Sequence, residues 1–177
     1  PAESTAYTLA RIDKAKYPGI TTANKDTPYY TNSSHLPVSY TSDIFDALDI
    51  QDRLQVKYTS GTVFHCFLGE KLPDWKSAAN LVKCVAENYR LPYFTLSPVY
   101  SICEDHGYLK GEQKVCPICG KPDEIYSRIT GYYRPVSNWN NGKFCEHLSR
   151  KYFDIGASYN ARKCKNEIKK TIIKAAE

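Results

Sequence analysis

Two closely spaced pairs of metal-ligating residues constrain this 177-residue chain more than any other feature. Cys103 and His106 are separated by two residues, and nine residues further on Cys116 and Cys119 are separated by two more. A two-residue gap lets both ligands of one turn face a single ion, and a thiolate-rich set selects Zn²⁺ over harder cations. A glycine follows each pair and allows the tight turn that such a knuckle needs. The spacing predicts a structural zinc site without an open catalytic position.

Two alternatives to this ligand set stay open. Cys145 replaces His106 if the helix expected after residue 142 folds back onto the turns. Cys116 and Cys119 also have the spacing of a redox dithiol. That motif usually opens a helix after a strand, whereas the proline between these cysteines and the glycine after them favour a knuckle. The metal site is therefore the preferred interpretation.

Composition and charge narrow the classes of protein that the chain can belong to. No apolar run reaches the roughly 18 residues of a membrane-spanning helix. The seven cysteines are unevenly spaced and no secretory pattern precedes them, which favours a reduced cytoplasmic compartment over a disulfide framework. The net charge is +5, and much of it lies near the C-terminus, where it indicates a solvated helix face or a surface for nucleic acid. The chain contains no Met, even at position 1, so a piece of a longer protein is expected.

Hydrophobic periodicity predicts mixed α/β structure before a change of composition near Ser97. The β-prone runs 62–68 and 92–98 flank a helical pattern, so they predict a βαβ unit with parallel strands. One such unit does not close a sheet, and we expect its partner strands to come from elsewhere. A short extended segment is expected near 28–32. The helices expected in this part are 4–15, one that ends at Leu54 after a cap at Thr41 or Ser42, and one capped by Asp74.

The part after Ser97 is poor in aliphatic residues and rich in Cys, Gly and Pro. A single glycine, Gly131, follows a short β-prone run there and precedes two tyrosines, an arginine and a proline. A turn is the ordinary reason for such a glycine. Glycine also has a chemical use, because its Cα carries two hydrogens and no side chain. Loss of one hydrogen leaves a radical that is stabilised over the amide nitrogen and the carbonyl, provided that the carbon is buried and held by a rigid loop.

The stretch RITGYYRPVSNWNNGK, in which Arg128, Gly131 and Tyr132 form an Arg-x-x-Gly-Tyr motif, resembles the glycyl-radical loop of the anaerobic (class III) ribonucleoside-triphosphate reductases. The stretches PAESTAYTLARIDKAKYP, YYTNSSHLPV and GTVFHCFLGE resemble the C-terminal portion of the same family. The cysteine pairs just before the loop are similar to the family's zinc site. Members often have four cysteines there, whereas position 106 is His; a site of three cysteines and one histidine remains chemically reasonable.

This resemblance implies a fold and a division of the chain. The fold is the C-terminal part of a ten-stranded α/β barrel of the glycyl-radical enzyme type, with a small zinc-binding module and C-terminal helices. Residues 1–97 are expected to belong to the barrel. The other expected segments are a zinc-binding knuckle module over 98–125, the glycyl-radical loop over 126–142 and a helical tail over 143–177, with a last basic helix from about Asn160.

The resemblance also implies a chemistry and its partners. Gly131 is expected to store a radical that an activase with an iron–sulfur cluster and S-adenosylmethionine generates. The radical is expected to be shielded beside a zinc ion. The ligands of this ion are Cys103, His106, Cys116 and Cys119. The radical passes to a cysteine, whose thiyl form abstracts the ribose 3′-hydrogen of a ribonucleoside triphosphate and so leads to a deoxyribonucleotide. The reductant is formate or a thioredoxin-type system.

The thiyl cysteine lies upstream in the family, so we assign none in this chain and expect the chain alone to be inactive. The remainder of the reductase chain, and a second copy in a homodimer, are the other expected partners. Two rival interpretations stay open. One is a zinc-ribbon module that binds nucleic acid through its basic tail, and the other is a stand-alone spare-part subunit that supplies the radical glycine to a damaged enzyme.

Overall fold

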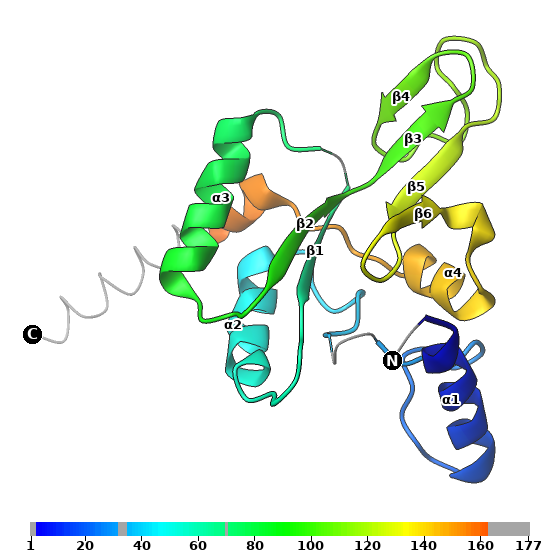
Figure 1. Ribbon diagram of the computed structural model, residues 1–177, viewed down its shortest axis with the longest axis vertical. Coiled ribbons are helices and arrows are strands. Elements are labelled where there is room, and N and C mark those ends of the chain that lie inside the picture. Colours follow the sequence, from blue (N-terminus) through cyan, green and yellow to red (C-terminus); the bar gives the residue numbers. More distant parts are fainter. Residues whose placement is uncertain (1–2, 32–34, 70, 163–177) are drawn as a thin grey trace, which may run out of the picture.

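The computed structural model describes residues 3–31, 35–69 and 71–162 of the chain (Figure 1). Its strands form a parallel pair, β1–β2, and a separate four-stranded sheet in the order β4–β3–β5–β6. The helices are α1 (Glu3–Lys16), α2 (Ile44–Gln55), α3 (Trp75–Asn88) and α4 (Asn141–Leu148), with a short 3-10 helix η2 at Val136–Asn138. The strands are β1 (Phe64–Leu68), β2 (Phe94–Pro98), β3 (Tyr100–Cys103), β4 (Gly107–Lys110), β5 (Glu124–Arg128) and β6 (Tyr133–Pro135).

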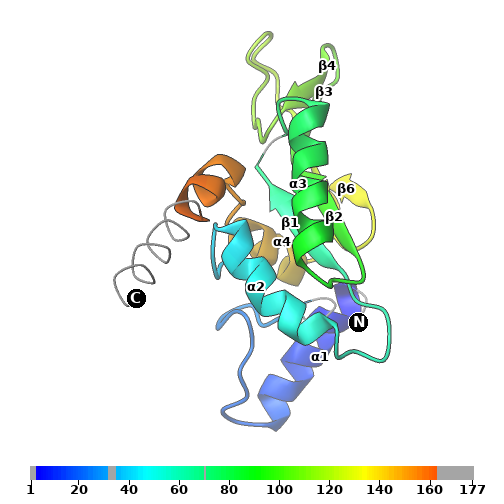
Figure 2. The same ribbon diagram turned by 90° about the vertical axis from the view of Figure 1, so that its left-hand side faces the viewer.

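The predicted βαβ unit is confirmed. β1 and β2 pair in parallel, with Phe64 opposite Phe94 and Leu68 opposite Pro98, and α3 connects them. All five residues of β1 are buried. A continuous apolar run is typical of a parallel strand, because such a strand is covered on both faces. α2 and α3 lie on one face of the pair (Figure 2).

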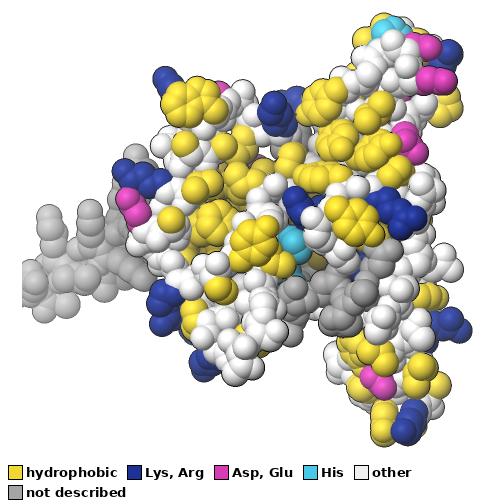
Figure 3. Space-filling view, in the orientation of Figure 1, with side chains coloured by type: hydrophobic (Ala, Val, Ile, Leu, Met, Phe, Trp, Pro, Cys, Tyr) yellow, Lys and Arg dark blue, Asp and Glu magenta, His cyan; other side chains and the backbone are white. Residues whose placement is uncertain are grey.

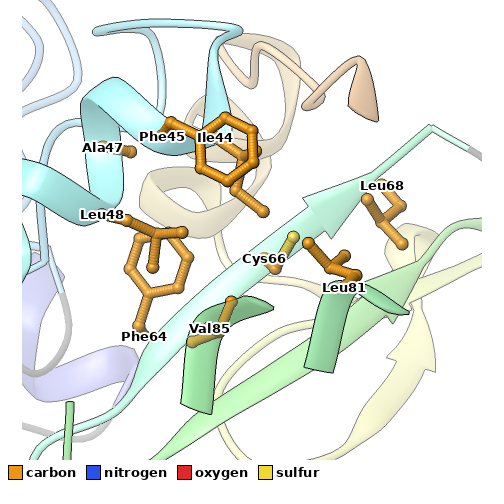
Figure 4. Close-up of a cluster of buried hydrophobic side chains, with 9 residues drawn as sticks. All are labelled: Ile44, Phe45, Ala47, Leu48, Phe64, Cys66, Leu68, Leu81 and Val85. Atoms are coloured by element: carbon orange, nitrogen blue, oxygen red, sulfur yellow. The ribbon is translucent and has the colours of Figure 1, made fainter. Parts of the chain in front are cut away.

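The main core fills the space between α2, α3 and β1 (Figure 4). Both helices begin at an aspartate whose carboxylate accepts from a backbone amide of the first turn, which satisfies one of the donors that a helix start leaves free. The Asp74 cap is confirmed. The predicted cap of α2 at Thr41 or Ser42 is wrong, because Asp43 caps that helix and the Thr41 hydroxyl instead accepts from the Asp43 amide. The core side chains are Ile44, Phe45, Ala47, Leu48, Phe64, Cys66, Leu68, Leu81 and Val85.

The second sheet follows β2 after a single residue, Val99, and is antiparallel throughout. Its central strands are β3 and β5, and it extends from Tyr100 to Pro135. The β3–β4 turn and the β5–β6 turn lie at opposite ends of this sheet (Figure 1). The sheet therefore joins the cysteine-rich segment and the glycine segment in one unit.

The first helix packs on α4. α4 begins after Asn140, whose side chain accepts from the Lys143 amide, and α1 lies beside α4 (Figure 1). Residues 155–162 are helical, so the expected last helix begins before Asn160, and the part of it after residue 162 lies outside the described residues. No strand forms over 28–31, the described part of the expected extended segment.

The expected barrel is not visible in the part of the chain that the structure describes. Only two of the described strands are parallel, and the other four form an antiparallel sheet of their own. Two parallel strands cannot close on themselves, so any barrel needs strands from outside this chain. None of the described helices is long and apolar enough to cross a membrane.

Candidate functional site

Three thiols and one imidazole form a compact cluster at the β3–β4 end of the antiparallel sheet. The ligand atoms of Cys103, His106, Cys116 and Cys119 all lie within 4.8 Å of one another. The Cys103 Sγ is 3.6 Å from the Cys119 Sγ and 3.6 Å from the His106 Nδ1. Ligands about 2.3 Å from a tetrahedral zinc ion are separated by about 3.8 Å, so these distances suit one such ion.

Two tight turns bring these side chains together. Cys103 ends β3, and Gly107 begins β4 with a φ of 71°. In the second turn the Gly120 amide donates to the Cys116 carbonyl at 2.9 Å, and the Cys116 amide donates to the Lys121 carbonyl at 2.8 Å. Gly120 has a φ of 73°, which a residue with a side chain rarely adopts. The second pair thus lies in a turn rather than at a helix start, which argues against the redox-dithiol alternative.

The thiols of the cluster differ in acidity. Burial raises the pKa of the Cys103 thiol, which is about 11. Burial also raises the pKa of Cys116, but backbone amides of Cys119 and Ile118 and the neighbouring thiols lower it to about 7. A proton is therefore lost more easily from Cys116 than from Cys103, and a metal ion that replaces the protons finds a largely anionic ligand at Cys116 near neutral pH.

The other cysteines of the described chain lie away from this cluster. Cys145, the alternative ligand, is half-buried on α4 and interacts electrostatically with Tyr29. Cys66 lies in the core on β1, and Cys84 lies on α3. The structure thus brings His106, and not Cys145, to the three thiols.

Gly131 lies in the turn between β5 and β6 and is exposed. No heavy atom other than its chain neighbours lies within 4 Å of the place that a Cβ would occupy. The expectation that Gly131 is shielded beside the metal ligands is wrong for this chain. The cysteine pairs precede β5 and the glycine follows it, so the length of an extended strand separates the two (Figure 1).

The turn is nevertheless held at its base. Ile129 is 2 % exposed, and its amide donates to the Tyr132 carbonyl at 3.1 Å. The Arg128 guanidinium donates from Nη1 to the Gly131 carbonyl at 2.8 Å. Arg150 donates to the Arg128 carbonyl at 3.0 Å and to the Ser127 hydroxyl at 2.9 Å. The glycine is thus open to its surroundings while the backbone on either side of it is fixed.

A row of polar side chains continues from Arg128 into the parallel pair. The Arg128 Nε donates to the Ser97 Oγ at 2.8 Å, and the Thr95 Oγ1 lies 3.1 Å from that hydroxyl. The Nδ1 of His65 lies 2.9 Å from the Thr95 Oγ1. Burial, followed by the charges of His35, Arg128 and Arg150, lowers the pKa of His65 to about 4. At neutral pH His65 is therefore uncharged, and its Nδ1 can accept the Thr95 hydroxyl.

Buried charged side chains on α4 and just after it pack against the base of the Gly131 turn. The Lys143 Nζ lies 2.5 Å and the Arg150 Nη2 3.1 Å from the Glu146 carboxylate. The Arg150 guanidinium also stacks 3.9 Å from the centre of the Phe67 ring. Sequence reasoning did not single out these residues. Their spacing on one helix face indicates ion pairs, but only the tertiary structure shows that they are buried.

Four tyrosines lie on one face of the antiparallel sheet, between the cluster and the Gly131 turn. The Tyr100 ring is 5.4 Å from the rings of Tyr126 and Tyr133 and 5.6 Å from that of Tyr108, centre to centre. Arg128 stacks 5.2 Å from the centre of the Tyr133 ring. Apolar side chains gather over this part of the molecule in Figure 3. The sequence contains the tyrosines but does not show that their rings meet.

Comparisons with known proteins identify the family to which the chain is similar. A family model described as anaerobic ribonucleoside-triphosphate reductase matches residues 1–153. A solved anaerobic ribonucleotide reductase is 28 % identical with a TM-score of 0.66, and 87 % of this chain aligns to 24 % of it. The Thermotoga maritima enzyme solved with MES in its active site is 30 % identical with a TM-score of 0.60, over 79 % of this chain and 22 % of that one. The same enzyme in complex with dATP and CTP is 27 % identical with a TM-score of 0.60, over 82 % and 23 %.

The chain thus spans about a quarter of the length of these reductase structures. No curated protein matches it.

Proposed function

The chain belongs to the anaerobic ribonucleoside-triphosphate reductase family, and from this premise we propose that it is the part of such an enzyme that stores a glycyl radical at Gly131. The observation that carries the proposal is the place of this glycine. It forms an Arg-x-x-Gly-Tyr motif at the apex of a braced turn, and no atom of the described chain covers its Cα. A radical-generating partner can therefore reach a Cα hydrogen without moving a side chain.

The proposed reaction begins with the loss of one hydrogen atom from the Gly131 Cα. An activase with an iron–sulfur cluster and S-adenosylmethionine supplies the organic radical that takes this hydrogen. The remaining electron is shared between the Cα, the amide nitrogen and the carbonyl of Gly131. It then passes to a cysteine outside this chain, whose thiyl form acts on the ribose of a ribonucleoside triphosphate. The product is a deoxyribonucleotide.

The remainder of the reductase has a structural role in this proposal. An exposed radical reacts with oxygen and solvent, so the other three-quarters of the enzyme must cover the Gly131 turn after activation. The same part supplies further strands to the β1–β2 pair, which becomes a section of a ten-stranded barrel. A homodimer in the cytoplasm, where the thiols stay reduced, completes the proposed assembly.

We further propose that Cys103, His106, Cys116 and Cys119 hold a zinc ion. Their thiols and imidazole are the donors that this ion prefers, and their separations fit a tetrahedral site. Four protein ligands leave no open position, so the ion would cross-link the two turns rather than take part in the reaction. No observation favours the nucleic-acid alternative, since most of the basic tail lies outside the described residues.

The test uses the full-length reductase together with its activase under anaerobic conditions. We expect a doublet in the electron paramagnetic resonance spectrum, and cleavage of the backbone at Gly131 after brief exposure to air. Gly131→Ala should give neither. Within this chain a Cβ at this position meets nothing within 4 Å, and thermal unfolding of the full-length variant checks that it folds as the wild type does. A doublet of unchanged intensity in Gly131→Ala would place the radical on another residue and contradict the proposal.

A further inference from the structure

From the hydrogen bond between Arg128 and the Gly131 carbonyl we infer that Arg128 is a positioning residue that polarises this carbonyl and so stabilises the radical. The inference rests on the proposed function of Gly131. The Arg128 Nη1 donates to the Gly131 oxygen at 2.8 Å. The donor is a cation and the acceptor is the carbonyl of the radical-bearing residue, so the bond is charge-assisted.

The effect of such a bond follows from the electronic structure of a glycyl radical. The amide nitrogen donates electron density and the carbonyl withdraws it, which places partial negative charge on the oxygen. A guanidinium at that oxygen stabilises this distribution more than it stabilises the closed-shell glycine. The C–H bond is then easier to break and the radical persists longer. The bond also fixes the plane of the carbonyl, with which the radical carbon must become coplanar.

Arg128 can act in this way only if its guanidinium cannot swing into solvent, and several contacts hold it. The Nε donates to the Ser97 Oγ at 2.8 Å, and Ser97 is fully buried. The face of the guanidinium stacks on the Tyr133 ring. The backbone carbonyl of Arg128 accepts from Arg150 at 3.0 Å. The side chain is therefore held by β2 and β6, and the backbone of Arg128 is held by the segment after α4.

The direction in which the Ser97 O–H bond points is also fixed by its neighbours. Because it accepts from Arg128, its own proton is available for the Thr95 Oγ1, 3.1 Å away. The Thr95 proton can then point to the Nδ1 of His65, 2.9 Å away. This row of hydrogen bonds begins at a cation and ends at a neutral acceptor. All its donors and acceptors agree in direction, so Ser97 presents a lone pair to Arg128.

Arg128 differs in this respect from the other arginines near the turn. Arg150 donates to the Arg128 carbonyl and to the Ser127 hydroxyl, and neither of these bonds reaches the Gly131 carbonyl. Arg90 follows α3, where its Nη2 donates to the Asp52 carboxylate at 3.0 Å. Arg90 thus provides a matched control, an arginine with a defined hydrogen-bond partner and no contact with the turn.

The experiment compares Arg128→Gln, Arg128→Lys, Ser97→Ala and Arg90→Gln in the full-length reductase. Glycine is labelled with ¹³C at the carbonyl carbon, and the activase generates the radical anaerobically. The readouts are the g-values and the carbonyl ¹³C hyperfine coupling of the doublet, the radical yield and its anaerobic half-life. The g-values report hydrogen bonding to the carbonyl oxygen, which a purely structural role of Arg128 would not change in a correctly folded turn.

In Arg128→Gln we expect the largest g-value to rise, the ¹³C coupling to change, and the radical yield or half-life to fall by about tenfold, as for loss of a charge-assisted hydrogen bond. Arg128→Lys should recover part of each effect. Ser97→Ala keeps the guanidinium but removes its buried anchor, so its values should lie between those of the wild type and Arg128→Gln. Arg90→Gln should match the wild type.

The outcomes separate this inference from the proposed function. If the wild type shows no doublet at Gly131, the proposed function fails. If the wild type shows it and Arg128→Gln gives the same g-values and coupling, only the role of Arg128 is overturned. If Arg128→Gln yields no radical at all, Ser97→Ala decides, because an unchanged spectrum in that variant overturns the inference and an intermediate spectrum supports it.

Discussion

Glu146 is the residue on which the buried charges behind the Gly131 turn depend. It lies between Lys143 and Arg150 and is 4 % exposed. Burial raises its pKa, but the two cations more than reverse this effect and hold the pKa below its ordinary value of 4.5. A buried ion group of this kind contributes less through attraction than it costs when one partner is removed. The anion therefore determines whether Lys143 and Arg150 can stay buried.

We predict that Glu146→Gln lowers the free energy of unfolding by about 3 kcal/mol, because it removes the carboxylate that lies between two buried cations. Since the pKa of Glu146 is lowered in the folded state, its contribution is complete above pH 4.5 and is lost as the pH falls through the lowered pKa. Denaturant unfolding between pH 7 and pH 3 measures both effects. The variant should be least destabilising, relative to the wild type, at the acid end.

The control for this change is Glu87→Gln on α3. Glu87 pairs with Lys83 at 3.8 Å, and both side chains are mostly exposed. Exposed pairs contribute little, so this variant should change the free energy of unfolding by less than about 0.5 kcal/mol. Equal effects of the two substitutions would show that the group around Glu146 is open to water.

At the scale of single residues, the sequence predicts the candidate metal ligands better than it predicts the contacts and burial of the residues around the site. The spacing of Cys116 and Cys119 suffices to propose a knuckle, because both ligands come from one turn. The contact between Arg128 and Ser97 joins residues 31 positions apart, and no local pattern indicates it. The exposure of Gly131 was also missed, since burial depends on what packs over the turn rather than on the residues within it.

At the scale of elements, the approach of α1 to α4 depends on the absence of one side chain. A Cβ on Gly142, in the first turn of α4, would lie 2.7 Å from the Tyr7 Cδ2 and 3.0 Å from its Cβ. These atoms belong to the base and ring of a side chain on α1, so they cannot move aside without moving the helix. Gly142 is thus required for packing rather than for a turn.

We therefore predict that Gly142→Ala destabilises the protein by about 2 kcal/mol, the usual cost of overpacking. The substitution should also weaken the docking of α1, which limited proteolysis of the N-terminal segment detects. The double variant with Tyr7→Ala should recover part of the loss, since the clash is removed. Gly61→Ala is the matched control, because a Cβ there meets nothing within 4 Å. A Gly142→Ala variant as stable as Gly61→Ala would contradict the close approach of the helices.

The elements themselves follow from local signals to different extents. The cap at Asp74 and the helical spacing after it predict α3 to within two residues, because both signals are local. α2 was expected to begin one or two residues too early, since Thr41, Ser42 and Asp43 are all good capping residues. The pairing of β5 with β3, rather than with the parallel strands, depends on contacts that are distant in sequence.

At the scale of the whole molecule, the proposed zinc ion and the main core stabilise different parts. The core residues come from α2, α3 and β1, and none of them belongs to the antiparallel sheet. The cluster instead closes the far end of that sheet. Loss of the ion should therefore be a local event.

We predict that a strong chelator in reducing buffer increases hydrogen exchange at the Cys116 and Gly120 amides at least about tenfold, as their turn opens. The Tyr89 amide at the end of α3, which donates to the Val85 carbonyl, should not change.

Matched variants test the same prediction. Cys119→Ser should mimic the chelator, whereas Cys145→Ser, a cysteine on α4 outside the cluster, should retain the metal. Metal analysis of the two purified variants measures this difference. Loss of metal from Cys145→Ser alone would show that the ligand set includes Cys145 in place of His106.

The overall architecture is the level that this sequence predicts least completely. The pattern of 62–98 suffices for one βαβ unit, but a barrel is a property of strands that must meet from distant parts of a chain. The described residues supply two of them. The motifs in the sequence correctly identified the family. They did not indicate that the glycine and the candidate metal ligands lie at opposite ends of one sheet.

Because of this separation, β5 transmits any change of orientation at the metal turns to the Gly131 turn. The strand is about 17 Å long at the usual rise per residue, with the thiols near one end and Gly131 beyond the other. A tilt of about 5° at the thiol end moves the glycine by about 1.5 Å, an error large enough to slow a hydrogen transfer by about two orders of magnitude. If Gly131 carries the proposed radical, the rigidity of the distant metal turns contributes, together with the bonds from Arg128 and Arg150, to the accuracy with which its Cα is placed.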